Sequence, residues 1–187
     1  MLAAHPDSAR AHQALAQNYF VLRQMPQAEK EYLEALRLRP ELPGLHLELG
    51  QVYANSAQWT KAEAEFRAET KLQPGSAEAA YRLGAALLQQ GRPHDALLEL
   101  KRSNDLKPDM PETVYSLGKA ASLDGDAATA EQAWSKVIEL EKKTSLAAQA
   151  HFGLAGLYRK QGNTAQSQHE MQEFQKLQDA IGPPRSE

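Results

Sequence analysis

Apolar and polar positions follow the period of the α-helix through most of this sequence. Short breaks that contain glycine, proline or helix-capping residues divide the pattern into helix-length segments. No stretch predicts a β-strand, so we expect an all-α chain, whose first helix should end near Gln24. Capping residues and prolines predict ten helices, which start at Ser8, Pro26, Pro43, Thr60, Ser76, Pro93, Pro111, Asp126, Thr144 and Asn163.

The predicted helices fall into pairs that repeat every 34 residues. In the stretch from Ala77 to Pro108, a first helix with Leu83 and Gly84 meets a break at Gly91, and a second helix with Leu100 ends at the proline. The last step is 37 residues, and the extra residues near 141–145 predict a longer turn or a lengthened helix. The leucine slot holds Leu15, Leu49, Leu83, Leu117 and Leu154, and the closing proline recurs as Pro6, Pro40, Pro74 and Pro108.

Each slot has a physical reason. Small residues at Gly50, Gly84 and Gly118 should let the two helices of a pair approach closely, although glycine in a helix costs about 1 kcal/mol relative to alanine. Most of these helices are too short to be stable alone, so they must be stabilised by stacking on their neighbours. One large residue per pair should fill the space between neighbouring pairs: Tyr32, Phe66, Leu100 and Trp134.

These slots, at this period, resemble the tetratricopeptide repeat. The resemblance runs from Ser8 to about Ala180 and implies an α-solenoid, a right-handed superhelix of five antiparallel helix pairs. The implied domain spans residues 8–182, with repeats at approximately 9–42, 43–76, 77–110, 111–147 and 148–181. The sequence departs from the family where histidine or another residue occupies the slot that often holds tryptophan, and at Ala16 and Ala155.

The two ends of the chain also carry expectations. Pro6 occupies the closing-proline slot, so residues 1–7 are expected to be the tail of an upstream repeat in a longer protein; a short natural leader is the alternative. Residues 183–187 are expected to form a disordered tail. The first helix would present Leu15 and Leu22 to a missing neighbour, and end-to-end self-association is therefore a hypothesis.

Composition narrows the class of protein without naming a ligand. The 187 residues include 21 basic and 24 acidic side chains, a balance that argues against a nucleic-acid partner. There is no cysteine, which excludes a disulfide framework and thiolate metal sites. The sequence predicts neither a membrane span nor a signal peptide, so we expect a soluble protein, and the compartment, cytoplasm or periplasm, stays open.

The sequence carries no pattern typical of an active site. Phosphate-loop and dinucleotide fingerprints and a serine nucleophile elbow are absent, so we expect no enzyme and no cofactor. His12, His46 and His151 share one slot, but equivalent residues of stacked helices lie about 10 Å apart, too far to share a metal ion. Packing histidines and no metal site are therefore expected. The glutamates of the early second helices are expected to form a solvated face: Glu29, Glu31, Glu34, Glu63, Glu65 and Glu69.

The resemblance implies a concave groove, lined by the first helices, that takes an extended peptide or a partner helix. Leu47, Tyr81, Tyr115 and Phe152 share one slot and would form an apolar ladder along it; the alternative is that they only fill space between helices. The clamp for acidic carboxyl-terminal tails, known in some relatives, is not expected, because Glu48 occupies one of its slots. The groove residues carried over by register are Gln13, Gln17, Phe20, Leu47, Gln51, Asn55, Tyr81, Arg82, Gln89, Tyr115, Lys119, Phe152 and Arg159.

The sequence thus predicts a non-catalytic scaffold that binds a protein or peptide ligand in this groove. Two alternatives stay open. One is an assembly or oligomerisation element that packs on other copies. The other is a substrate-positioning module of a larger enzyme. The identity of the ligand is not encoded in any pattern of this sequence.

Overall fold

The computed structural model describes residues 8–182, and every regular element in this range is an α-helix. The expected upstream tail and the expected disordered tail lie outside the described residues. None of the helices in the described range is long and apolar enough to cross a membrane. The helices are α1 (Ala9–Val21), α2 (Met25–Leu38), α3 (Leu45–Asn55), α4 (Trp59–Leu72), α5 (Ala77–Gln89), α6 (Pro93–Leu106), α7 (Pro111–Asp124), α8 (Ala127–Leu140), α9 (Ser145–Lys160) and α10 (Thr164–Ile181).

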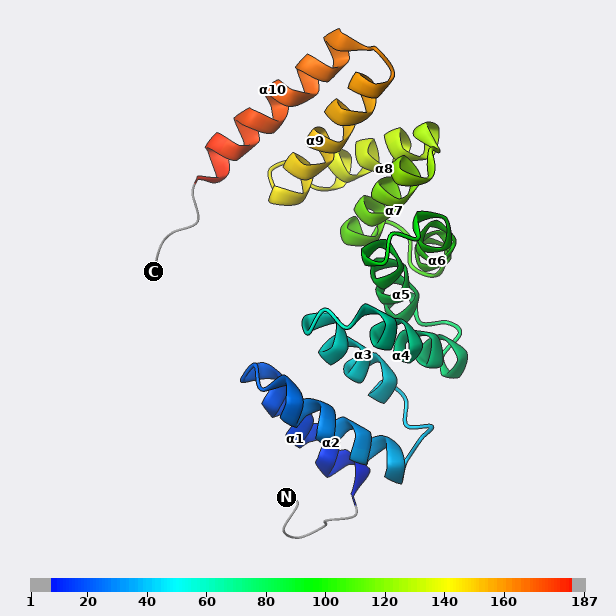
Figure 1. Ribbon diagram of the computed structural model, residues 1–187. Helices are drawn as coiled ribbons and strands as arrows, with labels where there is room; N and C mark the ends of the chain where they lie inside the picture. Colours follow the sequence, from blue (N-terminus) through cyan, green and yellow to red (C-terminus); the bar gives the residue numbers. More distant parts are fainter. Residues whose placement is uncertain (1–7, 183–187) are drawn as a thin grey trace. The chain divides into compact units, whose positions relative to one another are not determined.

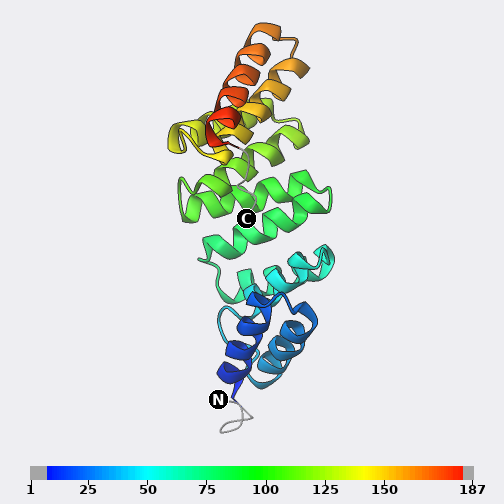
Figure 2. The same cartoon turned by 90° about the vertical axis from the view of Figure 1, so that its left-hand side faces the viewer.

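The chain divides into two compact units, Met1–Arg92 and Pro93–Glu187. In the first unit, α1 packs on α2 and α3 on α4 as antiparallel hairpins, and α2 and α4 also pack on the helix that follows each of them (Figures 1 and 2). In the second unit, the hairpins are α7 with α8 and α9 with α10, with α6 packed on α7 and α8 on α9. Each unit is therefore a stack of helices in which every helix contacts its neighbours in sequence.

One residue with a positive φ angle connects the two helices of every pair. Gly91, Gly125 and Gly162 adopt this left-handed conformation at φ values of 70°, 88° and 78°. Arg23 and Ala57 occupy the same turn position at 60° and 55°. Since a side chain in this conformation costs roughly 1–2 kcal/mol, the first two turns are strained relative to the other three. The turn geometry is kept in all five pairs even where the glycine is not.

Helix starts follow the predicted capping residues in four cases. The side chains of Ser8, Ser76, Asp126 and Thr144 each accept a hydrogen bond from a backbone N–H in the first turn. The prediction that Thr60 caps a helix is wrong: α4 starts at Trp59.

The reason lies in the preceding turn. The left-handed Ala57 places Gln58 at the N-cap, where its backbone carbonyl accepts from the N–H of Ala62. Similarly, α3 starts after the left-handed Gly44 rather than at Pro43, and α1 ends at Val21 rather than near Gln24.

Close approach of the paired helices depends on glycine. A Cβ atom on Gly50 would lie 2.5 Å from Cε1 of Phe66, and one on Gly118 would lie 2.7 Å from Cδ1 of Trp134. Trp134 also lies against Gly153 of the next pair, where a Cβ atom would come within 2.8 Å of the indole. The large aromatic residues therefore occupy the space that the glycines leave, as the small-residue slot predicts.

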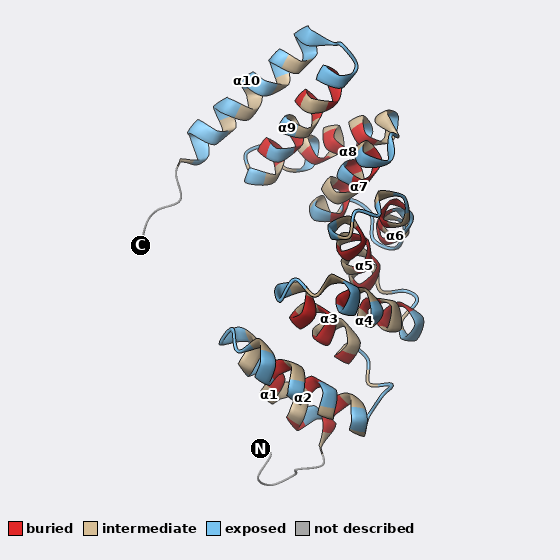
Figure 3. Ribbon diagram, in the orientation of Figure 1, coloured by how far each residue is buried: buried red, intermediate tan, exposed pale blue. Residues whose placement is uncertain are grey.

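The last pair differs from the others. α9 has 16 residues, so part of the extra length in the final repeat lengthens this helix, and Glu141–Thr144 form the turn before it. α10 has no buried residue (Figure 3). Met171, which occupies the slot of the buried Tyr32 and Phe66, is 42% exposed. The side of α10 that would be covered in an internal repeat is therefore open in the described part of the chain.

Candidate functional site

Three first helices of the first unit surround one hollow of about 430 Å³. α1, α3 and α5 supply most of its wall, and Trp59 and Phe66 of α4 supply the rest. Five of the residues predicted to form the groove come together here, one from α1 and two each from α3 and α5. The lining residues are Phe20, Gln51, Ala54, Asn55, Trp59, Phe66, Arg82, Ala85, Ala86 and Gln89. We refer to this hollow as the first-helix groove.

The first-helix groove combines an apolar floor with side-chain amides on its walls. Phe66 is buried, whereas Phe20 and Trp59 are half-buried. Asn55 donates its amide hydrogen to the backbone carbonyl of Gln51 at 2.8 Å, which fixes the amide and leaves Oδ1 as an acceptor. Such amides can both donate to and accept from the backbone of an extended peptide. The arrangement suits a ligand with an apolar side chain and an unpaired backbone.

Arg82 is the cation of the first-helix groove. Its Nε donates to Oε1 of Glu78 at 2.6 Å, and its guanidinium lies 5.6 Å from the ring centre of Tyr81. Both charged side chains are more than 40% exposed, so the ion pair is weak. Arg82 is thus oriented by its own helix while its charge stays available to a ligand.

Gln13 and Gln17, which were also predicted to contact a ligand, have partners within the protein. Gln13 Nε2 donates to one carboxylate oxygen of Glu48 at 2.9 Å, and Gln17 Nε2 donates to the other at 2.7 Å. Burial, together with a hydrogen bond to the same carboxylate, raises the pKa of Tyr32. Glu48 therefore connects α1, α2 and α3, and the two glutamines bind Glu48 rather than line the hollow.

The four residues of the predicted apolar ladder divide equally between the two units. In the first unit, Leu47 and Tyr81 are half-buried. In the second unit, Tyr115 is half-buried and burial raises its pKa. Phe152 is 56% exposed and contacts Phe174 of α10, with ring centres 5.3 Å apart. The remaining predicted residues of this unit, Lys119 and Arg159, are exposed.

Histidine and glutamate form the same pair in three repeats. Nδ1 lies 2.6 Å from a glutamate oxygen in His12–Glu31, His46–Glu65 and His151–Glu170, always 19 residues apart. Each pair joins the first helix of a repeat to its second, and each of these side chains is at most 22% exposed. Among the described residues no three histidine, aspartate or glutamate side chains gather as a metal site.

The expected solvated face of glutamates is wrong for most of its members. Besides the two that pair with histidine, Glu69 is fully buried, and its Oε1 accepts from the N–H of Gly44 at 3.0 Å and from Gln73. Although burial alone would raise it, hydrogen bonds from Gln90, Arg67 and Arg92 hold the pKa of Glu63 below its usual value. Arg67 and Gln73 are each four residues further along the same helix or at its end, whereas Gly44, Gln90 and Arg92 come from other segments, which a single-helix pattern does not reveal.

Tyrosine and glutamate join neighbouring repeats. The hydroxyl of Tyr53 donates to Glu29 at 3.1 Å, and that of Tyr158 donates to Glu131 at 2.7 Å. Burial and these carboxylates raise the pKa of both tyrosines to about 12. The bonds connect α3 to α2 and α9 to α8, so polar contacts accompany the apolar packing between repeats.

Two aromatic residues that line the first-helix groove were not predicted there: Phe66, which was predicted only to fill space between repeats, and Trp59, which was not predicted at all. Trp59 is the first residue of α4, and its carbonyl accepts from Gln90 at 3.4 Å. The first-helix register cannot find it, because it belongs to a second helix. Its signal in the sequence is a tryptophan directly after a turn, two residues beyond Ala57.

The fold and the first-helix groove together define an α-solenoid scaffold of helix pairs. A family model described as "Tetratricopeptide repeat" matches residues 47–111 and 115–167. The chain therefore belongs to the tetratricopeptide repeat family. No curated protein matches the sequence.

Solved structures share the fold. YrrB, described as a tetratricopeptide repeat protein with an unusual peptide-binding site, is 18% identical, with a TM-score of 0.84 over 95% of this chain and 90% of its own. MamA from Desulfovibrio magneticus is 20% identical, with a TM-score of 0.87 over 94% and 97%. PilF of Pseudomonas aeruginosa is 19% identical, with a TM-score of 0.74 over 95% and 78%. At these identities the comparisons establish the solenoid fold alone.

Membership of the family sets the general role of the protein. Tetratricopeptide repeats are protein–protein interaction scaffolds and are generally non-catalytic. The partner of this chain is accordingly a protein.

Proposed function

We propose that the protein binds an extended peptide segment of its partner in the first-helix groove. The observation that supports this is the convergence of Gln51, Asn55 and Gln89 beside the aromatic residues Phe20 and Trp59 around one hollow. Apolar contact area contributes affinity, while the amides select an unpaired peptide backbone. Proteins use the same division between apolar floor and few polar groups in many ligand sites.

The binding register follows from the positions of these side chains. An apolar side chain of the peptide enters between Phe20 and Trp59. The peptide backbone bonds the amides of Gln51 and Asn55, and Arg82 lines the same hollow. Since Glu78 already pairs with Arg82, an acidic residue in the peptide adds to binding but is not required. A micromolar dissociation constant corresponds to about −8 kcal/mol, which is within the reach of one such site.

Selection from a random peptide library displayed on phage tests this proposal. Peptides enriched on the wild-type protein are synthesised and their dissociation constants are measured by fluorescence anisotropy. The variant Q51A/N55A/Q89A should weaken binding at least tenfold, whereas Q27A/K30A, which alters two exposed residues of α2, should leave it unchanged. Equal affinity for both variants would place the peptide elsewhere. Circular dichroism establishes that each variant keeps its helix content.

A second candidate function, self-association, is favoured by one observation. Val21 and Leu22, at the end of α1, are 77% and 64% exposed. Two large apolar side chains in this position would be covered if another copy packed there. Light scattering over a range of concentrations tests this candidate: wild type should gain mass as concentration rises, and L22E should not. A constant monomeric mass for wild type rules it out.

A further inference from the structure

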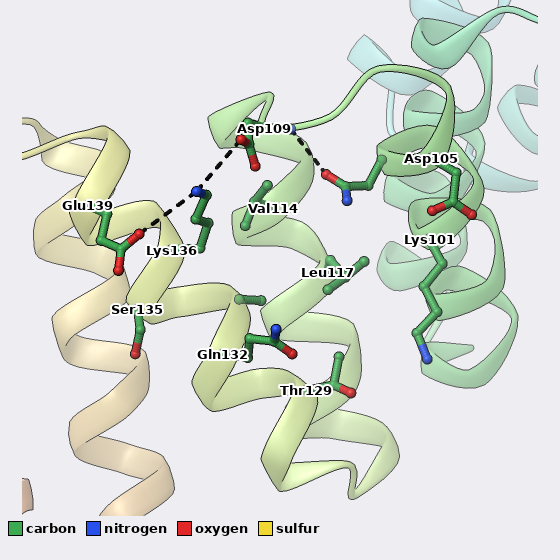
Figure 4. A pocket seen from close by; sticks show the side chains of 12 residues that line it. Lys101, Asp105, Asp109, Val114, Leu117, Thr129, Gln132, Ser135, Lys136 and Glu139 are labelled. Atoms are coloured by element: carbon green, nitrogen blue, oxygen red, sulfur yellow. Dashed lines mark hydrogen bonds and ion pairs between the residues drawn. The ribbon is translucent and has the colours of Figure 1, made fainter.

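A second hollow, of about 610 Å³, lies in the other unit and on different helices. Figure 4 shows it over α7, between α6 and α8. Val114 and Leu117 of α7 form an apolar floor, Ala133 of α8 also lines the hollow, and charged side chains of α6, α8 and the loop before α7 form the rim. We call it the α7 hollow. It shares no residue with the first-helix groove.

The α7 hollow lies where other repeats carry a histidine–glutamate pair. By register, Val114 stands in the slot of His12, His46 and His151, and Ala133 stands in the slot of Glu31, Glu65 and Glu170. In those three repeats the two side chains meet over the first helix at 2.6 Å. Valine and alanine are both too short to meet across the same space. The fourth repeat has lost both members of the pair.

The exposure of Leu117 is a second, independent sign that the floor of the α7 hollow is accessible. This residue belongs to the leucine slot, in which Leu49, Leu83 and Leu154 are 0%, 1% and 2% exposed, whereas Leu15 of the first repeat is half-buried. Leu117 is also only half-buried, although its repeat is an internal one. An apolar side chain that is covered in the second, third and fifth repeats is therefore accessible from the α7 hollow. Apolar surface at the bottom of a depression is a typical feature of a binding site.

The rim gives the ligand a preferred charge. Asp105, Asp109 and Glu139 outnumber Lys101 and Lys136. Nζ of Lys136 lies 3.6 Å from Asp109 and 3.8 Å from Glu139, and these long contacts between exposed groups are weak. In the part of the chain that the structure describes, no side chain pairs with the exposed carboxylate of Asp105. A cationic group can therefore bind at the rim with little competition.

We propose that the α7 hollow is a second docking site, for a peptide segment of a partner protein that carries a large apolar residue beside an arginine or lysine. The apolar side chain contacts Val114, Leu117 and Ala133. The basic side chain extends its methylene groups over the same floor and bonds Asp105 at the rim, as long cationic side chains commonly do. The site shares no residue with the first-helix groove, so binding at one surface uses none of the contacts of the other.

The test uses a defined probe, a short peptide with a central leucine between two arginines and glycine–serine flanks. Methyl resonances of Val114 and Leu117 are followed by NMR while the full chain is titrated with this peptide. Both resonances should shift and saturate. A peptide with glutamates in place of the arginines should bind at least tenfold more weakly. The absence of any shift at Val114 and Leu117, or equal binding of the two peptides, would overturn the proposal.

The protein itself supplies the matched variants. V114H/A133E rebuilds the pair of the other repeats and should weaken binding of the probe at least tenfold. D105K, which alters only an exposed side chain, should do the same and serves if the double variant does not fold. N55A should leave the binding of this probe unchanged, which separates the α7 hollow from the first-helix groove. Unchanged binding to D105K and to folded V114H/A133E would show that the hollow is not the site.

Discussion

Nδ1 of His46 lies 2.6 Å from Oε2 of Glu65, and the ring and the carboxylate are 20% and 22% exposed. The two residues belong to the first and second helices of one repeat, and two other repeats have the same pair. In the slot that often holds tryptophan in related repeats, this protein thus uses a hydrogen-bonded pair to join the helices. The pair is a feature of packing, and its absence from the fourth repeat changes the local surface.

A double-mutant cycle tests the contribution of this pair. H46A, E65A and the double variant should give a coupling free energy of about 1 kcal/mol, because the partly buried bond is shielded from water. Unfolding in urea at neutral pH measures the free energies. The pair of His94 and Asp124 is the control: the histidine is 74% exposed, and its coupling should be close to zero. Equal coupling in the two cycles would contradict this explanation.

Gly50 should be intolerant of even a methyl group. Its added Cβ atom would lie 2.5 Å from the buried ring of Phe66, which has no room to move away. We expect G50A to lower the free energy of unfolding by roughly 1–3 kcal/mol. At Gly75 an added Cβ atom meets nothing within 4 Å, so G75A should have no destabilising effect. Thermal melts of the two variants provide the comparison, and a G50A protein as stable as wild type would be inconsistent with the close approach.

The phenol of Tyr53 should lose its proton at an unusually high pH. Burial, the hydrogen bond to Glu29 and the charge of that carboxylate raise its pKa from 10.0 to about 12. Since the pKa is higher in the folded state, the stabilising effect is complete below pH 10 and is lost as the pH rises towards 12. Phenolate absorbance during an alkaline titration measures the pKa. Y53F should remove one late-ionising group, and E29Q should move the pKa of Tyr53 towards 10.0 while that of Tyr158 stays near 12.

The sequence predicts the solenoid because its signals are local. Leucine, glycine and proline return in register, and each acts on its own helix or on the helix next in the chain. The same register places Phe20, Asn55 and Arg82, among others, on first helices, and these residues meet in the first-helix groove. The position of a residue within the repeat pattern is therefore enough to nominate it as a candidate for this site.

Partners on neighbouring helices are harder to predict. Nothing in the single-helix pattern shows that Gln13 and Gln17 bind Glu48, or that Glu69 is buried beside Gly44. These contacts depend on how far each helix is displaced along the next. The histidine–glutamate pairs are an exception that the sequence could have predicted, because a histidine and a glutamate 19 residues apart recur in three repeats.

Peptide binding in the first-helix groove is the central claim, and side-chain amide NMR tests it most directly. A peptide enriched by selection is titrated into isotope-labelled protein. The NH₂ signals of Gln51, Asn55 and Gln89 should shift together and saturate at the dissociation constant measured by anisotropy. Signals from the α7 hollow should stay in place. Shifts confined to residues outside α1, α3 and α5, with these three amides unmoved, would contradict the proposed function.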